Sequence, residues 1–145
     1  MAKRQVCGTT TVATTPDKIF ELLTDPSKHA LLDGSGTVRA AQNGGPQRLE
    51  LGSRFGMDMK MGAPYKIRNT VVEFEQDRLI AWRHFNGHRW RWQLAPVGDG
   101  RTEVTETFDW STARVPPLIS ISPFPKRNKE GIDNSLRRLS EMFAG

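Results

Sequence analysis

Glu106 is the residue whose type fits its surroundings least. It lies between Val104 and Phe108, in a segment that alternates apolar and polar side chains, at a position where an apolar side chain is expected. A carboxylate at that position could anchor the hydroxyl or carbonyl of a ligand, or act as a general base. The alternative is a structural carboxylate near the end of a sheet, wetted by solvent or held in a salt bridge, and the sequence leaves both open.

His84 is the second candidate for acid–base chemistry. With Glu106 it could exchange protons with a bound ligand, although a hydrogen-bonded core histidine would have the same sequence pattern. His84 and His88 flank a tight turn, which is not a recognised zinc-binding spacing, and the single cysteine, Cys7, cannot form a thiolate cluster. We therefore expect no metal and no cofactor.

Two rows of alternating residues predict one wall of a cavity. Within each row every second side chain would point to the same face of a strand. Three of these residues are methionines, whose flexible side chains suit a wall that adapts to an irregular apolar ligand; the alternative is that they only fill the core. The rows are Phe55, Met57, Met59 and Met61 on one strand, and Tyr65, Ile67 and Asn69 on the next.

The register of one hairpin decides which aromatic side chains share that face. A two-residue turn at Asn86 and Gly87 would leave Trp82 on the face opposite Trp90. A three-residue loop with Gly87 in the left-handed conformation would instead pair Trp82 with Trp90 and keep the large apolar groups together. Because burying an aromatic side chain is favourable by roughly 1.5–3 kcal/mol, we predict the three-residue loop. The residues on the cavity face are then Trp82, His84, Trp90 and Trp92.

Cap signals and periodicity predict the elements that position these residues. Threonine and valine favour a strand over residues 5–13. Thr15 and Pro16 then start a short helix, and Asp25-Pro26 starts a second one that ends near Gly34. Alternation broken by turn residues predicts about six antiparallel strands over residues 37–109, with a bulge at Val71-Val72.

A long amphipathic helix ends the chain. Its apolar residues recur at spacings of four, three and four up to Phe143, which is one helical face. We expect this face to lie on the sheet and to roof the cavity with Ile132, Leu136 and Leu139. The predicted fold is therefore α+β, with a curved antiparallel sheet wrapped around the C-terminal helix and two short helices after the first strand.

The order of these elements resembles the SRPBCC superfamily of helix-grip proteins. The matching stretches are residues 12–26 (VATTPDKIFELLTDP) and 100–105 (GRTEVT), and residues 32–39 and 81–85 resemble a bacterial polyketide cyclase-like subgroup. The superfamily includes START lipid-transfer proteins, pollen-allergen-like proteins, coenzyme Q-binding proteins and polyketide cyclases. The resemblance implies a single START-like domain over residues 1–145, with a cavity between sheet and terminal helix that takes a hydrophobic molecule.

The charge balance and the lack of long apolar segments indicate which kinds of partner to expect. With 21 Lys and Arg against 16 Asp and Glu among 145 residues, the net charge of +5 is modest, and acidic residues are interspersed with the basic ones. We therefore do not expect nucleic-acid binding. The chain contains no run of 18 apolar residues, and its first residues are polar without an apolar segment behind them. We expect no stable membrane insertion, no secretion signal and a cytoplasmic location.

These observations favour a carrier over an enzyme. We expect the cavity to bind a small hydrophobic ligand, such as a lipid, an isoprenoid or an aromatic polyketide-like molecule. The first alternative is a polyketide cyclase or dehydratase-type enzyme that uses Glu106 and His84. The second is a protein-interaction module, which a large apolar patch on the outer sheet face would favour. The predicted ligand contacts are Phe55, Met57, Met59, Met61, Tyr65, Ile67, Asn69, Trp82, His84, Trp90, Trp92, Glu106, Phe108, Ile132, Leu136 and Leu139.

Overall fold

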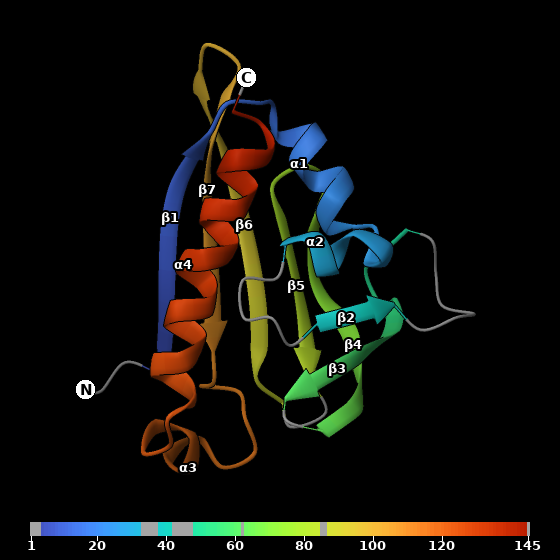
Figure 1. The fold of residues 1–145 in the computed structure, drawn as a ribbon, viewed down its shortest axis with the longest axis vertical. Helices are drawn as coiled ribbons and strands as arrows, with labels where there is room; N and C mark the ends of the chain where they lie inside the picture. The colour runs from blue at the N-terminus through green and yellow to red at the C-terminus, as the bar shows by residue number, and fades with distance from the viewer. Residues whose placement is uncertain (1–3, 33–37, 42–47, 62, 85–86, 145) are drawn as a thin grey trace.

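A single antiparallel sheet forms the body of the protein. The structure, a computed structural model, describes residues 4–32, 38–41, 48–61, 63–84 and 87–144. In these segments seven strands pair in the order β1-β7-β6-β5-β4-β3-β2 (Figure 1). The strands are β1 (Gln5–Val12), β2 (Val38–Ala41), β3 (Arg54–Met61), β4 (Ala63–Glu75), β5 (Leu79–His84), β6 (Arg89–Gly98) and β7 (Arg101–Asp109). The predicted α+β fold is confirmed.

The first helical segments begin where the cap signals predict. Pro16 opens the first turn of its helix after Thr15, and the Asp25 side chain accepts a hydrogen bond of 3.0 Å from the Ser27 backbone N–H. The predicted stop at Gly34 lies outside the described residues. The segments are α1 (Pro16–Leu23), the 3-10 turn η1 (Pro26–Lys28), α2 (His29–Leu32), α3 (Pro116–Ser120) and α4 (Phe124–Met142). Among the described helices, none is both long and apolar enough to cross a bilayer.

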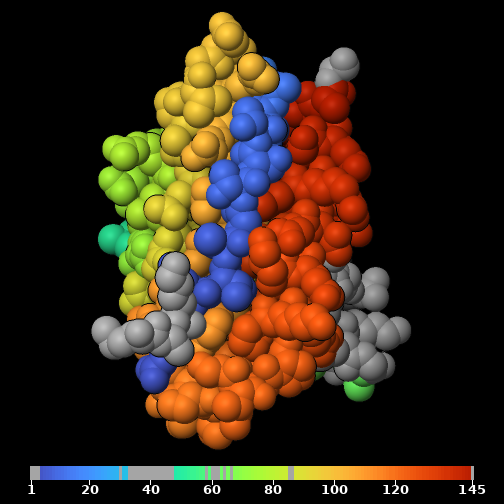
Figure 2. All heavy atoms as spheres, turned by 90° about the vertical axis from the view of Figure 1, so that its left-hand side faces the viewer, coloured from blue at the N-terminus to red at the C-terminus, as the bar shows by residue number. Residues whose placement is uncertain are grey.

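Helix α4 lies along β1 and β7 on the inner face of the sheet (Figures 1 and 2). Its residues Ile132, Leu136 and Leu139 are at most 3% exposed. A Cβ added to Gly8 of β1 would lie 3.0 Å from side-chain atoms of both Ile132 and Leu136. The missing side chain at Gly8 therefore lets α4 approach β1 closely and seals this half of the core.

The β5–β6 hairpin has the predicted register. Trp82 pairs with Trp90 across the two strands. The His84 N–H donates to the His88 carbonyl at 3.0 Å, and Gly87 has a φ of 95°, as a three-residue loop requires. Phe85 and Asn86 lie outside the described residues. The predicted bulge on β4 is also confirmed, since the register against β5 shifts between Val71 and Glu73.

The outer face of the sheet carries an ion-pair network. The Arg91 guanidinium donates to both carboxylate oxygens of Glu73, at 2.9 and 2.8 Å, and Arg89 donates to Glu73 at 2.9 Å. These hydrogen bonds, that of Arg91 above all, lower the pKa of Glu73. The network joins β4 to β6 across β5. This part of the outer face is therefore ionic, whereas the protein-interaction alternative calls for an apolar patch there.

Candidate functional site

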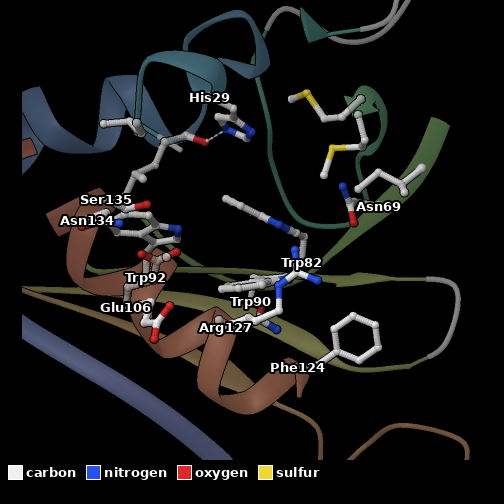
Figure 3. A pocket seen from close by; sticks show the side chains of 18 of the residues that line it. His29, Asn69, Trp82, Trp90, Trp92, Glu106, Phe124, Arg127, Asn134 and Ser135 are labelled. Carbon is white, nitrogen blue, oxygen red and sulfur yellow. Dashed lines mark hydrogen bonds between the residues drawn. The ribbon is translucent and has the colours of Figure 1, made fainter. Parts of the chain in front are cut away.

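A cavity of about 290 Å³ lies between the inner face of the sheet and the helices (Figure 3). Its volume is close to the lower end of the range of about 300–1,000 Å³ that is common for ligand pockets. The sheet contributes Phe55, Met57, Met59, Ile67, Asn69, Trp82, Trp90, Trp92 and Glu106. The helices contribute Leu23, His29, Leu32, Phe124, Arg127, Asn128, Glu130, Gly131, Asn134 and Ser135.

Strand alternation explains the sheet side of this cavity. Phe55, Met57 and Met59 occupy every second position of β3, and their exposed fractions are 3, 2 and 9%. The cross-strand pair of Trp82 and Trp90 continues the same inner surface through β5 and β6. Of the predicted rows, Phe55, Met57, Met59 and Ile67 therefore form an apolar floor together with these tryptophans. Met61 lies on β3, but its side chain is outside the described residues.

Asn69 is a buried polar residue in this floor. Its side chain is 3% exposed, and its Oδ1 has no hydrogen-bond partner in the described part of the chain. Buried polar groups are nearly always hydrogen-bonded, and losing such a bond typically costs about 1–3 kcal/mol. Because Asn69 also lines the cavity, a donor on a bound ligand or an ordered water is well placed to satisfy it.

Glu106 lies in the middle of β7 and faces the cavity. It is 6% exposed and pairs with Trp92 of β6, so it is not at the end of the sheet. Figure 3 shows Glu106 grouped with Asn134 and Ser135 of α4, on the opposite side of the cavity from Asn69. Three strand spacings separate β7 from β4, about 14 Å. The cavity therefore has a polar group at each end and aromatic rings between them.

His29 is a site residue that the sequence did not reveal. It is 8% exposed, and its Nε2 lies 2.8 Å from the Leu23 carbonyl oxygen. Its ring stacks on Trp82 with centroids 4.9 Å apart and meets the edge of Phe55 at 5.5 Å. Burial lowers the pKa of His29, while the hydrogen bond to Leu23 raises it in part. The neutral ring with its proton on Nε2 therefore donates to Leu23 and closes the cavity beneath α2.

The α4 wall differs from the predicted roof. The sequence predicts Ile132, Leu136 and Leu139 as cavity residues, but the structure packs these side chains into the core above β1 and β7. The adjacent flank of α4 lines the cavity instead. Its positions are single or adjacent residues that recur every three or four positions along the helix, namely Phe124, Arg127, Asn128, Glu130, Gly131, Asn134 and Ser135. The reason is the offset of α4 to one side of the sheet, which leaves its most apolar stripe over the strands and its polar flank toward the cavity.

Three further predicted residues lie elsewhere. His84 stacks on His88 at the end of the hairpin, with ring centroids 4.7 Å apart, and is not among the residues that line the cavity. Phe108 is 2% exposed and packs under Trp90, with ring centroids 5.0 Å apart. Tyr65 is 39% exposed and does not line the cavity. The structure thus does not bring His84 and Glu106 together in the cavity wall.

The family of the chain follows from comparison with known proteins. The family model described as polyketide cyclase / dehydrase and lipid transport matches residues 3–143. The chain belongs to this family. The SRPBCC resemblance in residues 12–26 and 100–105 is thereby confirmed.

The chain is also similar to individual relatives in sequence and to several solved structures in fold. The uncharacterized protein Rv0088 of Mycobacterium tuberculosis (strain ATCC 25618 / H37Rv) is 38% identical over 138 residues, which are 92% of this chain and 61% of that protein. The chain therefore spans about three fifths of the length of that relative. Among solved structures, protein CV1439 from Chromobacterium violaceum has a TM-score of 0.74 at 16% identity, covering 97% of this chain and 98% of its own. The Aha1 dimer from Colwellia psychrerythraea has a TM-score of 0.70 at 16% identity, covering 96 and 95%.

Proposed function

We propose that this polyketide cyclase and lipid-transport family member is a carrier for a small, largely apolar molecule. The observation that carries the proposal is the cavity itself, with an apolar floor from the four strands β3–β6 and a polar flank of α4. Thioether and indole side chains adapt to irregular apolar surfaces and offer large contact areas. A lipid, an isoprenoid or an aromatic polyketide-like molecule has this chemistry.

The polar groups favour a ligand that also has an oxygen function. Glu106 with Asn134 and Ser135 forms one end of the cavity, and Asn69 lies toward the other. A hydroxyl group that reaches Glu106 would donate a charge-assisted hydrogen bond, which is stronger than a bond between neutral partners. The proposed ligand is therefore an apolar molecule with a terminal hydroxyl or carbonyl, rather than a plain hydrocarbon.

Native mass spectrometry tests this proposal. The purified protein is mixed with dodecanol, a short-chain isoprenoid quinone and 2-naphthol in turn, and we expect at least one of them to bind with a stoichiometry of one. A Ser135→Leu variant should lose this binding, because the longer side chain enters the cavity from α4. Failure of every probe to bind at micromolar concentrations would contradict the proposal.

The matched control is Ser140→Leu on the same helix. Ser140 is half-buried and does not line the cavity, so the same chemical change should leave ligand binding intact. Circular dichroism melting of both variants separates loss of binding from loss of folding. Equal loss of binding in the two variants would place the ligand outside the cavity.

An enzyme of the cyclase or dehydratase type remains the second candidate. Its support is the buried Glu106 carboxylate in the cavity, together with the description of the family. General acid–base catalysis by a single positioned group contributes typically 10²–10⁴-fold in rate. Turnover of an aromatic polyketide that collapses in Glu106→Gln would favour this candidate over a carrier.

A further inference from the structure

Helix α3 and the residues beside it carry a cluster of exposed apolar side chains. Val115, Leu118, Ile121 and Phe124 have exposed fractions of 50, 60, 83 and 44%. Figure 1 shows α3 at one end of the molecule, beyond the ends of the strands, and Figure 2 shows the same segment at the lower end of the surface. A contiguous apolar patch that a folded protein leaves in solvent commonly marks an interaction site. We call these four residues the α3 tip.

The α3 segment that carries the tip is fixed to the rest of the protein by buried contacts. Ile119, between two of the exposed residues, is 9% exposed and points into the core. The indole N–H of Trp110 donates to the Ser120 hydroxyl at 2.8 Å, and Trp110 itself is 3% exposed. The helix therefore buries one side and presents the other, so the exposure of the α3 tip is set by its packing.

The charges around the tip are mainly basic, although the exposed Glu130 follows them in α4 and lines the cavity together with Phe124 and Arg127. Residues 110–129 contain four basic residues and no acidic residue. Arg114 and Lys126 are exposed beside the tip, whereas Lys129 is paired with Asp133 at 2.8 Å. Apolar side chains flanked by basic ones are the pattern that binds the interface of an anionic bilayer, because each lysine or arginine near such a surface adds to the attraction.

The tip also lies at the mouth of the cavity. Phe124 belongs to the tip and lines the cavity, and the exposed Arg127 lines it as well. A surface that contacted the α3 tip would therefore lie next to the place where the cavity reaches solvent. An apolar molecule leaving that surface would have a short path to the cavity.

We infer that the α3 tip docks on an anionic lipid bilayer, as a peripheral contact without a membrane span. Leu118 and Ile121 enter the interfacial region, and Arg114 and Lys126 contact the anionic headgroups. The inference does not depend on which molecule the cavity carries. It adds to the proposed function a partner surface from which an apolar ligand would be collected or to which it would be delivered.

Vesicle co-sedimentation tests the inference. The protein should bind vesicles of phosphatidylcholine with 30% phosphatidylglycerol and bind pure phosphatidylcholine vesicles far more weakly, with the difference shrinking at high salt. The double variant Leu118→Ser/Ile121→Ser should bind the anionic vesicles at least tenfold more weakly. The affinity of the double variant Arg114→Gln/Lys126→Gln for the anionic vesicles should fall about fivefold for each charge removed.

The control replaces exposed apolar residues elsewhere. Leu51 and Val97 are 64 and 51% exposed, so Leu51→Ser/Val97→Ser removes comparable surface away from the tip and should leave vesicle binding within twofold. Equal binding by the tip variant and this control would overturn the inference. So would a wild-type dimer that ignores vesicles and becomes monomeric in the tip variant, because the tip would then be an interface between two copies.

Binding of 2-naphthol in solution, measured by native mass spectrometry, tests the carrier function independently of membrane docking. The tip variants should retain it, since neither Leu118 nor Ile121 lines the cavity. Loss of vesicle binding with intact naphthol binding supports the docking surface. Intact vesicle binding without binding of 2-naphthol, dodecanol or the isoprenoid quinone would leave the docking surface standing and contradict the carrier function.

Discussion

Acidification from pH 7 to pH 5 should destabilise the protein through its histidines. The imidazoles of His84 and His88 stack with centroids 4.7 Å apart and an interplanar angle of 17°, and His88 also meets the edge of Phe108 at 5.3 Å. Burial and the neighbouring His84 lower the pKa of His88 from 6.5 to about 4. Folding therefore favours the neutral form of His88.

The sign and size of the effect follow from linkage. The unfolded chain takes up a proton on His88 as the pH falls through about 6.5, whereas the folded protein does so only near pH 4. The stabilisation is complete above pH 6.5 and is lost as the pH falls toward 4. At pH 5 the loss is about 2 kcal/mol, since each pKa unit corresponds to about 1.4 kcal/mol. Burial also lowers the pKa of His84 and of His29, so their contributions have the same sign.

Urea unfolding at pH 7, 6 and 5 measures this loss. The His88→Phe variant keeps a ring between His84 and Phe108 but cannot take up a proton, so its free energy of unfolding should fall by about 2 kcal/mol less than that of the wild type over this range. Glu73 contributes little to this loss above pH 5, because its pKa is lowered from 4.5. A wild-type free energy of unfolding that stays constant between pH 7 and 5, or an identical loss in His88→Phe, would show that His88 is not the source of the pH dependence.

Three further substitutions test separate parts of the account. Glu106→Gln should weaken 2-naphthol binding about fivefold, because a hydrogen bond to a carboxylate contributes about 1 kcal/mol more than one to a neutral acceptor. The affinity for 2-methylnaphthalene, which has no hydroxyl group, should not change. Titrations followed by tryptophan fluorescence measure both affinities. Glu73→Gln should lower the free energy of unfolding, measured with urea, by about 1–3 kcal/mol, because it removes the closer of the two charged partners of Arg91 and leaves Asp109 at 3.5 Å; this loss should shrink at high salt. Gly87→Ala should lower the free energy of unfolding by about 1–3 kcal/mol, because Gly87 has a φ of 95° and the added Cβ would lie 2.5 Å from the Thr112 carbonyl oxygen. An unchanged melting temperature would contradict this prediction.

The sheet side of the site could be predicted because strand geometry is local. Side chains alternate strictly along a strand, so the spacing of Met57 and Met59 fixes their common face before any partner is known. The hairpin register followed from the need to bury Trp82 and Trp90 on one side, and the structure confirms it. Glu106 stood out for the same reason, as a polar residue at an inward position.

The helical side depends on long-range docking and could not be predicted in this way. Periodicity gives the most apolar stripe of α4, but whether that stripe or its neighbour faces the cavity depends on where the helix rests on the sheet. His29 likewise reaches the cavity only because α2 folds over Trp82, which no local pattern in residues 25–32 indicates. His84 shares a strand with Trp82, yet it stacks on His88 beyond the cavity wall.

NMR of the methionine methyl groups tests most directly where an apolar ligand binds. Met57 and Met59 line the cavity, whereas Met142 is 43% exposed at the end of α4, so the same spectrum holds probe and reference. Titration with 2-naphthol should shift the methyl signals of Met57 and Met59 in wild-type protein, leave that of Met142 in place, and have no effect on the Ser135→Leu variant. Shifts confined to Met142, or shifts at Met57 and Met59 that survive in Ser135→Leu, would show that the ligand binds somewhere other than the space between the sheet and α4.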